Sequence, residues 1–434
     1  MNMKAFAESY KAYIGSCKTE WEAAAYAEKE LIANGFREVN AILAAGETLQ
    51  PGDKVYETNR DRGVCAAVVG EKDAFQIVAG HLDSPVAFLR PNPALERCGL
   101  ALGGTFGKGG LRRHTWVDIP LALHGKVVLK DGTVKELVVG EKAEDPVLLI
   151  SEITAHVSAS QAAKPLRDAY TDDQLVVALG TLAQGADCRA YLDELLQAQA
   201  GVSYDDLKYG DIYVVPALMP RDVGLDRSMI AAYGHDDRIC VYCALQAILQ
   251  AKPSGNTAVA MLIDREELGS RGNTGADSEF YRNFLMKVRK ANTGDESTLG
   301  LVAALSGSRA INGDVTFAAE PMDGGLMELS NNALLGRGTA VATYGGNGLP
   351  QFRGSVQRVL DEKNIPWQVS TAIKGGGLSF YSSVSQSFNK QNMDAISIGP
   401  ALSGMHTAYE LVSKADLYAT YQSYLAFMEA TTLL

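Results

Sequence analysis

Cysteine is scarce in this sequence, with six residues in a chain of 434. They stand at Cys17, Cys65, Cys98, Cys188, Cys240 and Cys243. This spacing is too sparse for the disulfide framework of a small secreted domain, so we interpret the cysteines as reduced thiols. Cys240 and Cys243 form the one C-x-x-C, and without a second pair the pattern favours packing on one helix face over metal binding.

Long apolar runs are also missing. No stretch approaches the roughly 18 to 20 apolar residues that a membrane-spanning helix needs. Residues 1–20 combine Glu and Lys in an amphipathic helical pattern and lack the apolar core and cleavage site of a signal peptide. The sequence therefore predicts a cytoplasmic protein with no membrane partner.

Basic residues are outnumbered by acidic ones, 40 to 51, which gives a formal charge of −11. Nucleic acids and anionic membranes bind through clustered Lys and Arg, so this balance argues against both as partners. The hydrophobic content of 47% and charged content of 21% are ordinary for a globular protein. A chain of this length can bury a sizeable core in more than one domain.

Two common catalytic motifs are absent. The glycine-rich stretch GGTFGKGG at 103–110 fails as a phosphate-binding loop, because Lys108 is followed by Gly109 rather than Ser or Thr. No Gly-x-Ser-x-Gly element occurs, which disfavours conventional serine hydrolase chemistry.

Helical and strand patterns alternate at both ends of the chain and predict an α/β fold. Residues 5–34 predict a long helix or a broken pair, 75–79 and 257–264 predict buried strands, and 235–252 predicts a helix. A capping box of Ser413 and Asp416 predicts the start of a final helix. The middle is different, with a hairpin pattern at 126–139. We therefore predict one discontinuous domain, 1–92 and 227–434, interrupted by a β-rich domain at 93–226.

Two of only six histidines, His81 and His406, follow apolar strands, where α/β folds build their sites. Either histidine alone is more often a structural residue than a metal ligand.

Adjacent Glu266 and Glu267 also follow a strand. The strand pleat would point their side chains to opposite sides, one toward a metal and one toward water. Asp236 by itself reads equally as a helix cap, and Asp314 as a turn residue. Together these residues suit a hydrolase with two divalent ions about 3.5 to 4 Å apart, and zinc fits the mixed oxygen and imidazole set.

The sequence resembles the aspartyl aminopeptidase family of dinuclear zinc metallopeptidases along essentially its whole length. The matching stretches are AGHLDSP at 79–85, TWVDIPLALHGKVV at 115–128, DREELGS at 264–270 and GMHTAYE at 404–410. Each motif alone is weak, but their order along the chain is specific. The resemblance implies a mixed-sheet zinc exopeptidase domain with helices on both faces, and a smaller inserted dimerisation domain.

The resemblance also implies roles for single residues. His81 and Asp314 would hold one zinc, Glu267 and His406 the other, and Asp236 would bridge them. Asp83 would orient His81, and Glu266 would be the general base that takes a proton from the attacking water. His156 resembles a histidine that the inserted domain lends to a neighbouring subunit to stabilise the oxyanion. Arg337 falls where the family tends to carry a Lys near the substrate carboxylate.

The sequence departs from the family pattern at several places. Arg265 and Phe317 replace a usual His, His235 replaces a usual Leu, and the stretch GGGLSF at 375–380 is altered. The changes at Phe317 and 375–380 touch the expected substrate pocket. A preference for Asp or Glu at the amino terminus is the first hypothesis, and a broad or neutral-residue aminopeptidase remains its alternative.

Two further readings stay open. One keeps the metals, two Zn²⁺ per subunit or Mn²⁺ or Co²⁺ as substitutes, but makes the enzyme a deacylase or carboxypeptidase. The other is a non-catalytic assembly protein, which the retained Glu266 disfavours. The expected partners are small peptide substrates and further copies of the chain, as a dimer-based homo-oligomer that can reach a dodecamer.

Overall fold

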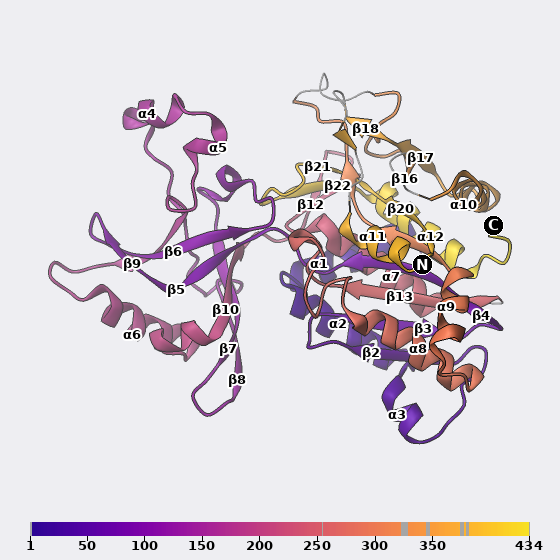
Figure 1. The fold of residues 1–434 in the computed structure, drawn as a ribbon. Coiled ribbons are helices and arrows are strands. Elements are labelled where there is room, and N and C mark those ends of the chain that lie inside the picture. Colours follow the sequence, from indigo (N-terminus) through magenta and orange to yellow (C-terminus); the bar gives the residue numbers. More distant parts are fainter. Residues whose placement is uncertain are drawn as a thin grey trace. The chain divides into compact units, whose positions relative to one another are not determined.

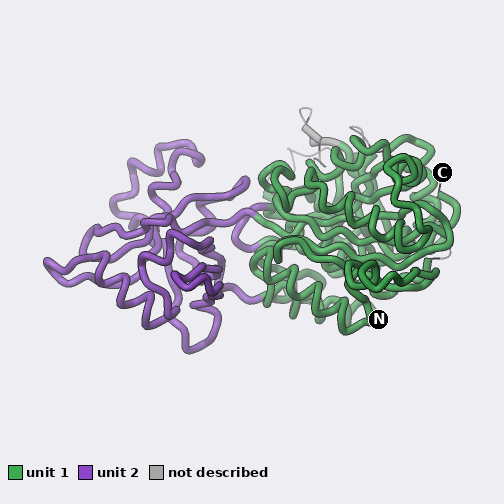
Figure 2. The backbone as a smooth tube through the Cα atoms, turned by 60° about the horizontal axis from the view of Figure 1, so that its bottom comes forward, with its two compact units in different colours: residues 1–84, 220–405, 410–434 green, residues 85–219, 406–409 purple. Residues whose placement is uncertain are grey.

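The computed structural model describes residues 2–253, 255–322, 329–343, 348–373, 377–378 and 382–433. The chain divides into two compact units, coloured green and purple in Figure 2. The first unit comprises residues 1–84, 220–405 and 410–434, and the second comprises 85–219 and 406–409. The sequence places the insert at 93–226, so the observed unit begins and ends several residues earlier and also takes in a short segment near the C-terminus.

The first unit is built on a nine-stranded mixed sheet (Figure 1). In spatial order its strands are β1 (Arg37–Glu38), β2 (Lys54–Thr58), β3 (Val64–Val68), β13 (Asn256–Ile263), β4 (Lys72–His81), β14 (Arg309–Gly313), β20 (Asp394–Gly399), β16 (Thr339–Ala342) and β17 (Trp367–Ser370). The central four, β13, β4, β14 and β20, are parallel to one another. Their carboxyl ends therefore meet at one edge of the sheet.

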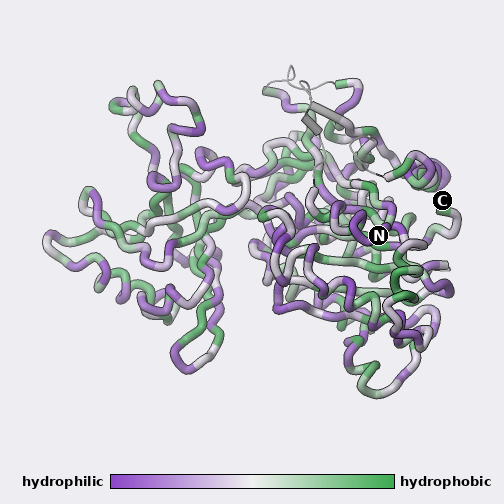
Figure 3. The backbone as a smooth tube through the Cα atoms, viewed as in Figure 1, coloured by the Kyte–Doolittle hydropathy of each residue, from purple (hydrophilic) through white to green (hydrophobic). Residues whose placement is uncertain are grey.

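Helices cover both faces of this sheet, as the α/β prediction requires. One face packs α1 (Met3–Ser16), α2 (Glu20–Ala33), α7 (His235–Gln250), α10 (Pro350–Glu362) and α12 (Lys414–Glu429). The other packs α3 (Val39–Ala44), α8 (Glu279–Thr293), α9 (Thr298–Ser306) and α11 (Ser383–Lys390). Strand residues alternate between the two cores, since Val78 faces the first and Ile77 the second. Figure 3 colours the backbone by hydropathy and shows hydrophobic stretches among the strands of this unit.

The helix predictions are largely confirmed. Residues 5–34 form a broken pair, because Thr19 caps α2 through a capping box with Glu22. Cys240 and Cys243 lie in the apolar core around α7, as expected for packing residues. One detail is wrong: Ser413 caps α12 by accepting from the backbone N of Ala415, but Asp416 does not close a capping box. Its carboxylate instead accepts from the backbone N–H groups of Gly336 and Gly338.

A smaller sheet completes the first unit. Its strands, in spatial order, are β11 (Arg221–Val223), β12 (Met229–Ala232), β22 (Glu410–Ser413), β21 (Ala401–Ser403) and β15 (Thr316–Phe317). A separate strand pair joins β18 (Ala372–Ile373) to β19 (Gly377–Leu378). None of the helices in the described ranges is long and apolar enough to cross a bilayer.

The second unit is β-rich, with a six-stranded sheet. Its strands, in spatial order, are β8 (Val134–Val139), β7 (Leu121–Val128), β10 (Gly210–Pro216), β5 (Val86–Arg97), β6 (Leu100–Lys108) and β9 (Val176–Thr181). The predicted hairpin is present as the antiparallel pair β7 and β8. The glycine-rich stretch at 103–110 lies mostly in β6. The helical segments are η1 (Arg113–Trp116), η2 (Ala155–Val157), α4 (Ala159–Ala162), α5 (Leu166–Ala169), α6 (Cys188–Ala200) and η3 (Tyr204–Tyr209).

Candidate metal centre and active site

Three predicted site residues stand at the carboxyl edge of the central parallel strands. His81 is the last residue of β4, and Asp314 follows β14 directly. On the other side of β4, strand β13 pairs Ile263 with His81, so the turn that carries Glu266 begins at the same edge. Parallel pairing thus brings together residues that are far apart in the sequence.

Asp236 reaches this edge from the start of α7. The backbone at Asp236 and Asp237 is not helical, and the peptide bond between them is cis. The backbone N of Asp236 donates to Oε2 of the buried Glu410 at 3.1 Å, and the hydroxyl of Ser84 donates to the Asp236 carbonyl. This location is consistent with Asp236 as a metal ligand rather than as a helix cap alone.

His81, Asp236 and Asp314 form a compact buried cluster. Nε2 of His81 lies 3.3 Å from Oδ1 of Asp236 and 3.8 Å from Oδ1 of Asp314. One ligand atom from each of the three lies within 4.8 Å of the others. Two carboxylates and one imidazole at this spacing are a donor set that suits zinc.

The ring of His81 is held in the orientation that a metal ligand needs. Its Nδ1 lies 2.9 Å from the main-chain carbonyl oxygen of Asp83, so Nδ1–H donates there and Nε2 is the nitrogen that faces the carboxylates and could bind a metal. The backbone N of His81 donates to Oδ2 of Asp237 at 3.0 Å. The carboxylate oxygen Oδ1 of Asp83 is farther from Nδ1, at 3.5 Å.

The cluster holds more negative charge than its buried surroundings favour. Burial raises the pKa of Asp314 to about 6, and the charges of Glu266 and Asp236 add to this against the lowering effect of His81. Burial also raises the pKa of Asp237 well above its usual range. For His81, burial lowers the pKa, but hydrogen bonds to Asp236, Asp314 and Asp83 outweigh it and raise the value well above normal. Protons offset the carboxylate charge here, and a divalent cation can replace them, so the residues fit a metal ion.

Glu266 and Glu267 lie in a short turn rather than on an extended strand. They begin the 3₁₀ turn η4 (Glu266–Leu268), flanked by Arg265 and Gly269 in left-handed conformations. The two residues therefore do not lie on the extended strand whose pleat was expected to separate their side chains. Oε1 of Glu266 accepts hydrogen bonds from the backbone N (2.8 Å) and the hydroxyl (3.1 Å) of Ser383.

His406 lies in the segment 406–409, which belongs to the second unit. Its backbone is left-handed, with φ of 65°. Nδ1 of His406 is 3.3 Å from the carbonyl oxygen of Gly110, and the His406 carbonyl accepts from the backbone N of Arg112. As in His81, a carbonyl partner at Nδ1 makes Nε2 the nitrogen that can bind a metal.

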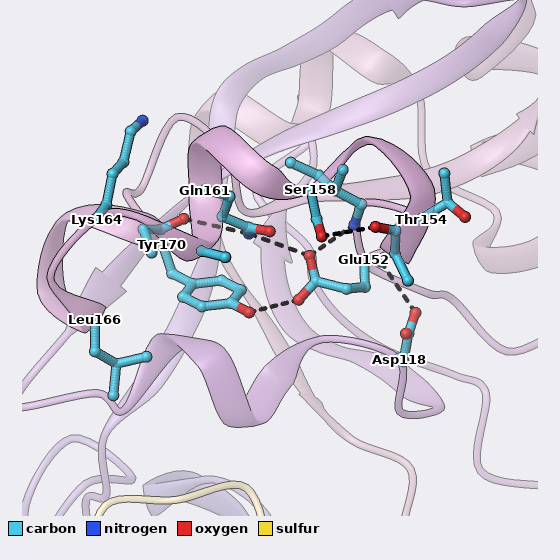
Figure 4. A pocket seen from close by; sticks show the side chains of 12 residues that line it. Asp118, Glu152, Thr154, Ser158, Gln161, Lys164, Leu166 and Tyr170 are labelled. Atoms are coloured by element: carbon cyan, nitrogen blue, oxygen red, sulfur yellow. Dashed lines mark hydrogen bonds between the residues drawn. The ribbon is translucent and has the colours of Figure 1, made fainter.

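His156 is exposed in η2 of the second unit. Its chain neighbours Ala155 and Ser158 line a hollow of about 610 Å³ whose lining also includes Glu152, Gln161 and Tyr170. Figure 4 shows Glu152 between these two partners: Oε2 accepts from the Tyr170 hydroxyl at 2.5 Å and Oε1 from Nε2 of Gln161 at 3.1 Å. These bonds tie both ends of the segment that carries His156.

Arg337 is exposed in the first unit, between the two glycines whose N–H groups bind Asp416. Phe317 is half-buried in β15. In the stretch 375–380, residues 377 and 378 lie in β19, and the others lie outside the described residues.

Three residues that contact the site are not predicted from the sequence: Asp237, Ser383 and Glu410. Glu410 lies in the GMHTAYE stretch, and Asp237 is the sequence neighbour of the predicted ligand Asp236. Their positions in the sequence could therefore have indicated that both lie near the site. Ser383 stands in the serine-rich stretch YSSVSQS at 381–387, which gives no indication of a site.

Comparison with known proteins shows which family the chain is similar to. Residues 13–428 match the family described as Aminopeptidase I zinc metalloprotease (M18). A probable M18 family aminopeptidase 1 of Clostridium acetobutylicum is 34% identical, covering 98% of this chain and 94% of that protein. The crystal structure of an M18 aminopeptidase from Thermotoga maritima has a TM-score of 0.91 at 33% identity, covering 99% of this chain and 97% of that one.

A more distant solved structure, described as an S. cerevesiae mApe1 dodecamer, is 15% identical with a TM-score of 0.79 over 98% of this chain and 97% of that one. At this identity the likeness shows the fold alone. The family match and the two closer relatives each span nearly the whole chain, so the chain belongs to the M18 family of zinc aminopeptidases, hydrolases that act on peptide bonds.

Proposed function

We propose that this aminopeptidase works with two ions per chain. His81 and Asp314 would hold one ion, Glu267 and His406 the other, and Asp236 would bind both. The observation that carries the proposal is the buried cluster of His81, Asp236 and Asp314, with ligand atoms within 4.8 Å of one another. A bridging carboxylate is the usual way to keep two ions about 3.5 to 4 Å apart.

The place of His406 in this scheme rests on chain connectivity. The segment 406–409 leaves the first unit after Met405 and rejoins it at Glu410. The Glu410 carboxylate accepts from the backbone N of Asp236. Four residues of extended chain span at most about 14 Å, which limits how far His406 can lie from Glu410 along the chain.

Glu266 is the residue that we assign as general base. It would take a proton from the attacking water and later pass it to the departing amine. The bound ions would polarise the peptide carbonyl and make the water more acidic. Asp83 supports Glu266, because its Oδ1 accepts from the Glu266 backbone N at 2.9 Å.

We further propose a preference for Asp or Glu at the amino terminus, with neutral residues as the alternative. An acidic side chain needs a cation, and Arg337 is the candidate because it is exposed on a turn that Asp416 fixes. The preference is a separate proposal from the metal chemistry.

The proposed assembly is a homo-oligomer built through the second unit, up to a dodecamer. The dodecameric state of the mApe1 relative supports the larger assembly. His156 of a neighbouring copy would then stabilise the oxyanion of the reaction. Its exposure and the anchoring of its segment by Glu152 suit such a role.

The test is the variant Glu266→Gln, assayed on free-amine peptides and on the same peptides with blocked amino termini. We expect wild-type protein to cleave only free-amine substrates, and Glu266→Gln to lose turnover while keeping its metal. Wild-type rates in the variant would refute the assignment of the base. Equal wild-type rates on blocked peptides would favour a deacylase or carboxypeptidase.

A further inference from the structure

The carboxylate of Glu266 is anchored through one oxygen. Both hydrogen bonds that it accepts from the described part of the chain end on Oε1, from the backbone N of Ser383 at 2.8 Å and from its hydroxyl at 3.1 Å. A carboxylate has two oxygens, and this anchor turns one of them toward α11. Oε2 is then the oxygen that can meet the attacking water.

Ser383 is the first residue of α11. Its backbone N–H therefore has no partner within the helix, and the carboxylate of Glu266 satisfies it from outside. A negative charge at a helix N-terminus is also favoured by the helix dipole. Neighbouring Ser382 caps the next N–H, that of Val384, so the two donors are divided between two acceptors.

A second serine fixes the direction of the Ser383 hydroxyl. Oγ of Ser270 lies 2.6 Å from Oγ of Ser383. The single proton of Ser383 is used toward Glu266, so Ser270 must donate to Ser383. Ser270 is buried in the same turn as Glu266, and its backbone N donates to the carbonyl of Arg265 at 2.7 Å. Ser383 is thus held between two residues of the segment 265–270.

We propose that Ser383 is a positioning residue for the general base, and that Ser270 orients its hydroxyl. The proposal rests on the proposed role of Glu266 and adds to it. Without the Ser383 hydroxyl, the carboxylate keeps one hydrogen bond from the backbone N and can rotate about it. Such a loss of orientation should lower the rate of the chemical step and leave substrate and metal binding unchanged.

The experiment compares the steady-state kinetics and metal content of Ser383→Ala, Ser383→Thr, Ser270→Ala and Glu266→Gln in the metal-loaded enzyme. We expect Ser383→Ala to lower kcat by roughly 10- to 100-fold with KM and metal content unchanged, the size of effect that misplacement of a catalytic group gives. Ser383→Thr keeps a hydroxyl and should recover most of the lost kcat. Ser270→Ala should show a smaller fall in kcat.

Ser385→Ala is the matched control. Ser385 is half-buried in the same first turn of α11, but its hydroxyl donates to the carbonyl of Ser382 and not to Glu266. It should keep wild-type kcat. Wild-type kcat in Ser383→Ala, beside an inactive Glu266→Gln, would overturn the role of Ser383 while the assignment of the base stands. Loss of metal in Ser383→Ala without recovery in Ser383→Thr would also overturn it, as a structural effect, whereas an active Glu266→Gln would remove the proposed function itself.

Discussion

The main-chain carbonyl oxygen of Asp83 accepts Nδ1–H of His81 at 2.9 Å, while the Asp83 carboxylate accepts the backbone N–H of Glu266 at the same distance. Asp83 therefore holds Nδ1 of His81 chiefly through its backbone carbonyl, with its carboxylate farther away at 3.5 Å, and serves the base through its side chain. The sequence predicts the first role but assigns it to the carboxylate. This division separates metal binding from the positioning of the base.

Substitutions at Asp83 should reflect this division. Asp83→Ala removes the acceptor for Glu266 but keeps the backbone carbonyl that orients His81. We expect its kcat to fall roughly 10- to 100-fold, as for other partners of metal-site residues, with metal content close to wild type. Asp83→Asn keeps an oxygen acceptor and should lose less. Kinetics with metal analysis checks this, and a metal-free Asp83→Ala would contradict it.

Metal removal should destabilise the fold, and the variant Asp314→Asn should make this loss of stability smaller. In the metal-free protein burial raises the pKa of Asp314 to about 6, and the charges of Glu266 and Asp236 add to this. An ion at 100 times its Kd adds about 2.7 kcal/mol to the free energy of unfolding. Asp314→Asn removes both a ligand and a buried charge, so the rise in Tm on adding zinc should shrink. Thermal melts with and without zinc measure it, and an unchanged rise would exclude Asp314 as a ligand.

Much of the fold and part of the site can be predicted from the sequence. Apolar runs such as 75–79 and 257–264 become central strands, because buried parallel strands need continuous apolar sequence. His81 and Asp314 could then be placed at the strand ends. Local patterns do not show long-range contacts, so the backbone partners of Asp416 at 336 and 338 were not predictable from its capping-box spacing.

The turn at Glu266 marks a second limit. A strand pattern continues into Asp264, and no local signal shows that Arg265 takes a left-handed backbone, with φ of 67°. Ser383 contacts Glu266 from 117 residues away, through a helix that packs on the sheet only in the folded protein. Contacts of this kind are set by tertiary packing, so local patterns in a single sequence do not predict them.

Arg337 provides a test of residue preference. Arg337→Ala should raise KM for peptides that begin with Asp or Glu by roughly tenfold, the effect of losing one hydrogen bond to a charged group. Peptides that begin with Leu should be unaffected. Arg282→Ala, an arginine on the outer helix α8, is the control and should change neither. Equal losses on acidic and neutral substrates would show that Arg337 does not select the residue.

Asp416 predicts a pH dependence of stability away from the metal centre. Burial raises its pKa to about 6, although the N–H groups of Gly336, Gly338 and Arg337 lower it. The folded state then binds more protons than the unfolded state between about pH 4 and 6, so this group costs stability as pH rises through that window. The cost is on the order of 3 kcal/mol at neutral pH.

Asp416→Asn removes this dependence, since an amide does not titrate. The difference in unfolding free energy between wild type and variant should therefore favour wild type more at pH 4.5 than at pH 7.5. Denaturant unfolding at the two pH values measures it, because titrating groups common to both proteins cancel in the difference. A difference that does not change with pH would contradict the raised pKa.

The measurement closest to the central claim is the number of metal ions per chain, taken together with activity before and after chelation. The protein should hold two ions per chain, lose the release of amino-terminal residues when they are removed, and regain it with zinc. One ion per chain at full activity would contradict the two-ion site, and activity that survives complete metal removal would contradict metal-dependent catalysis at His81, Asp236 and Asp314.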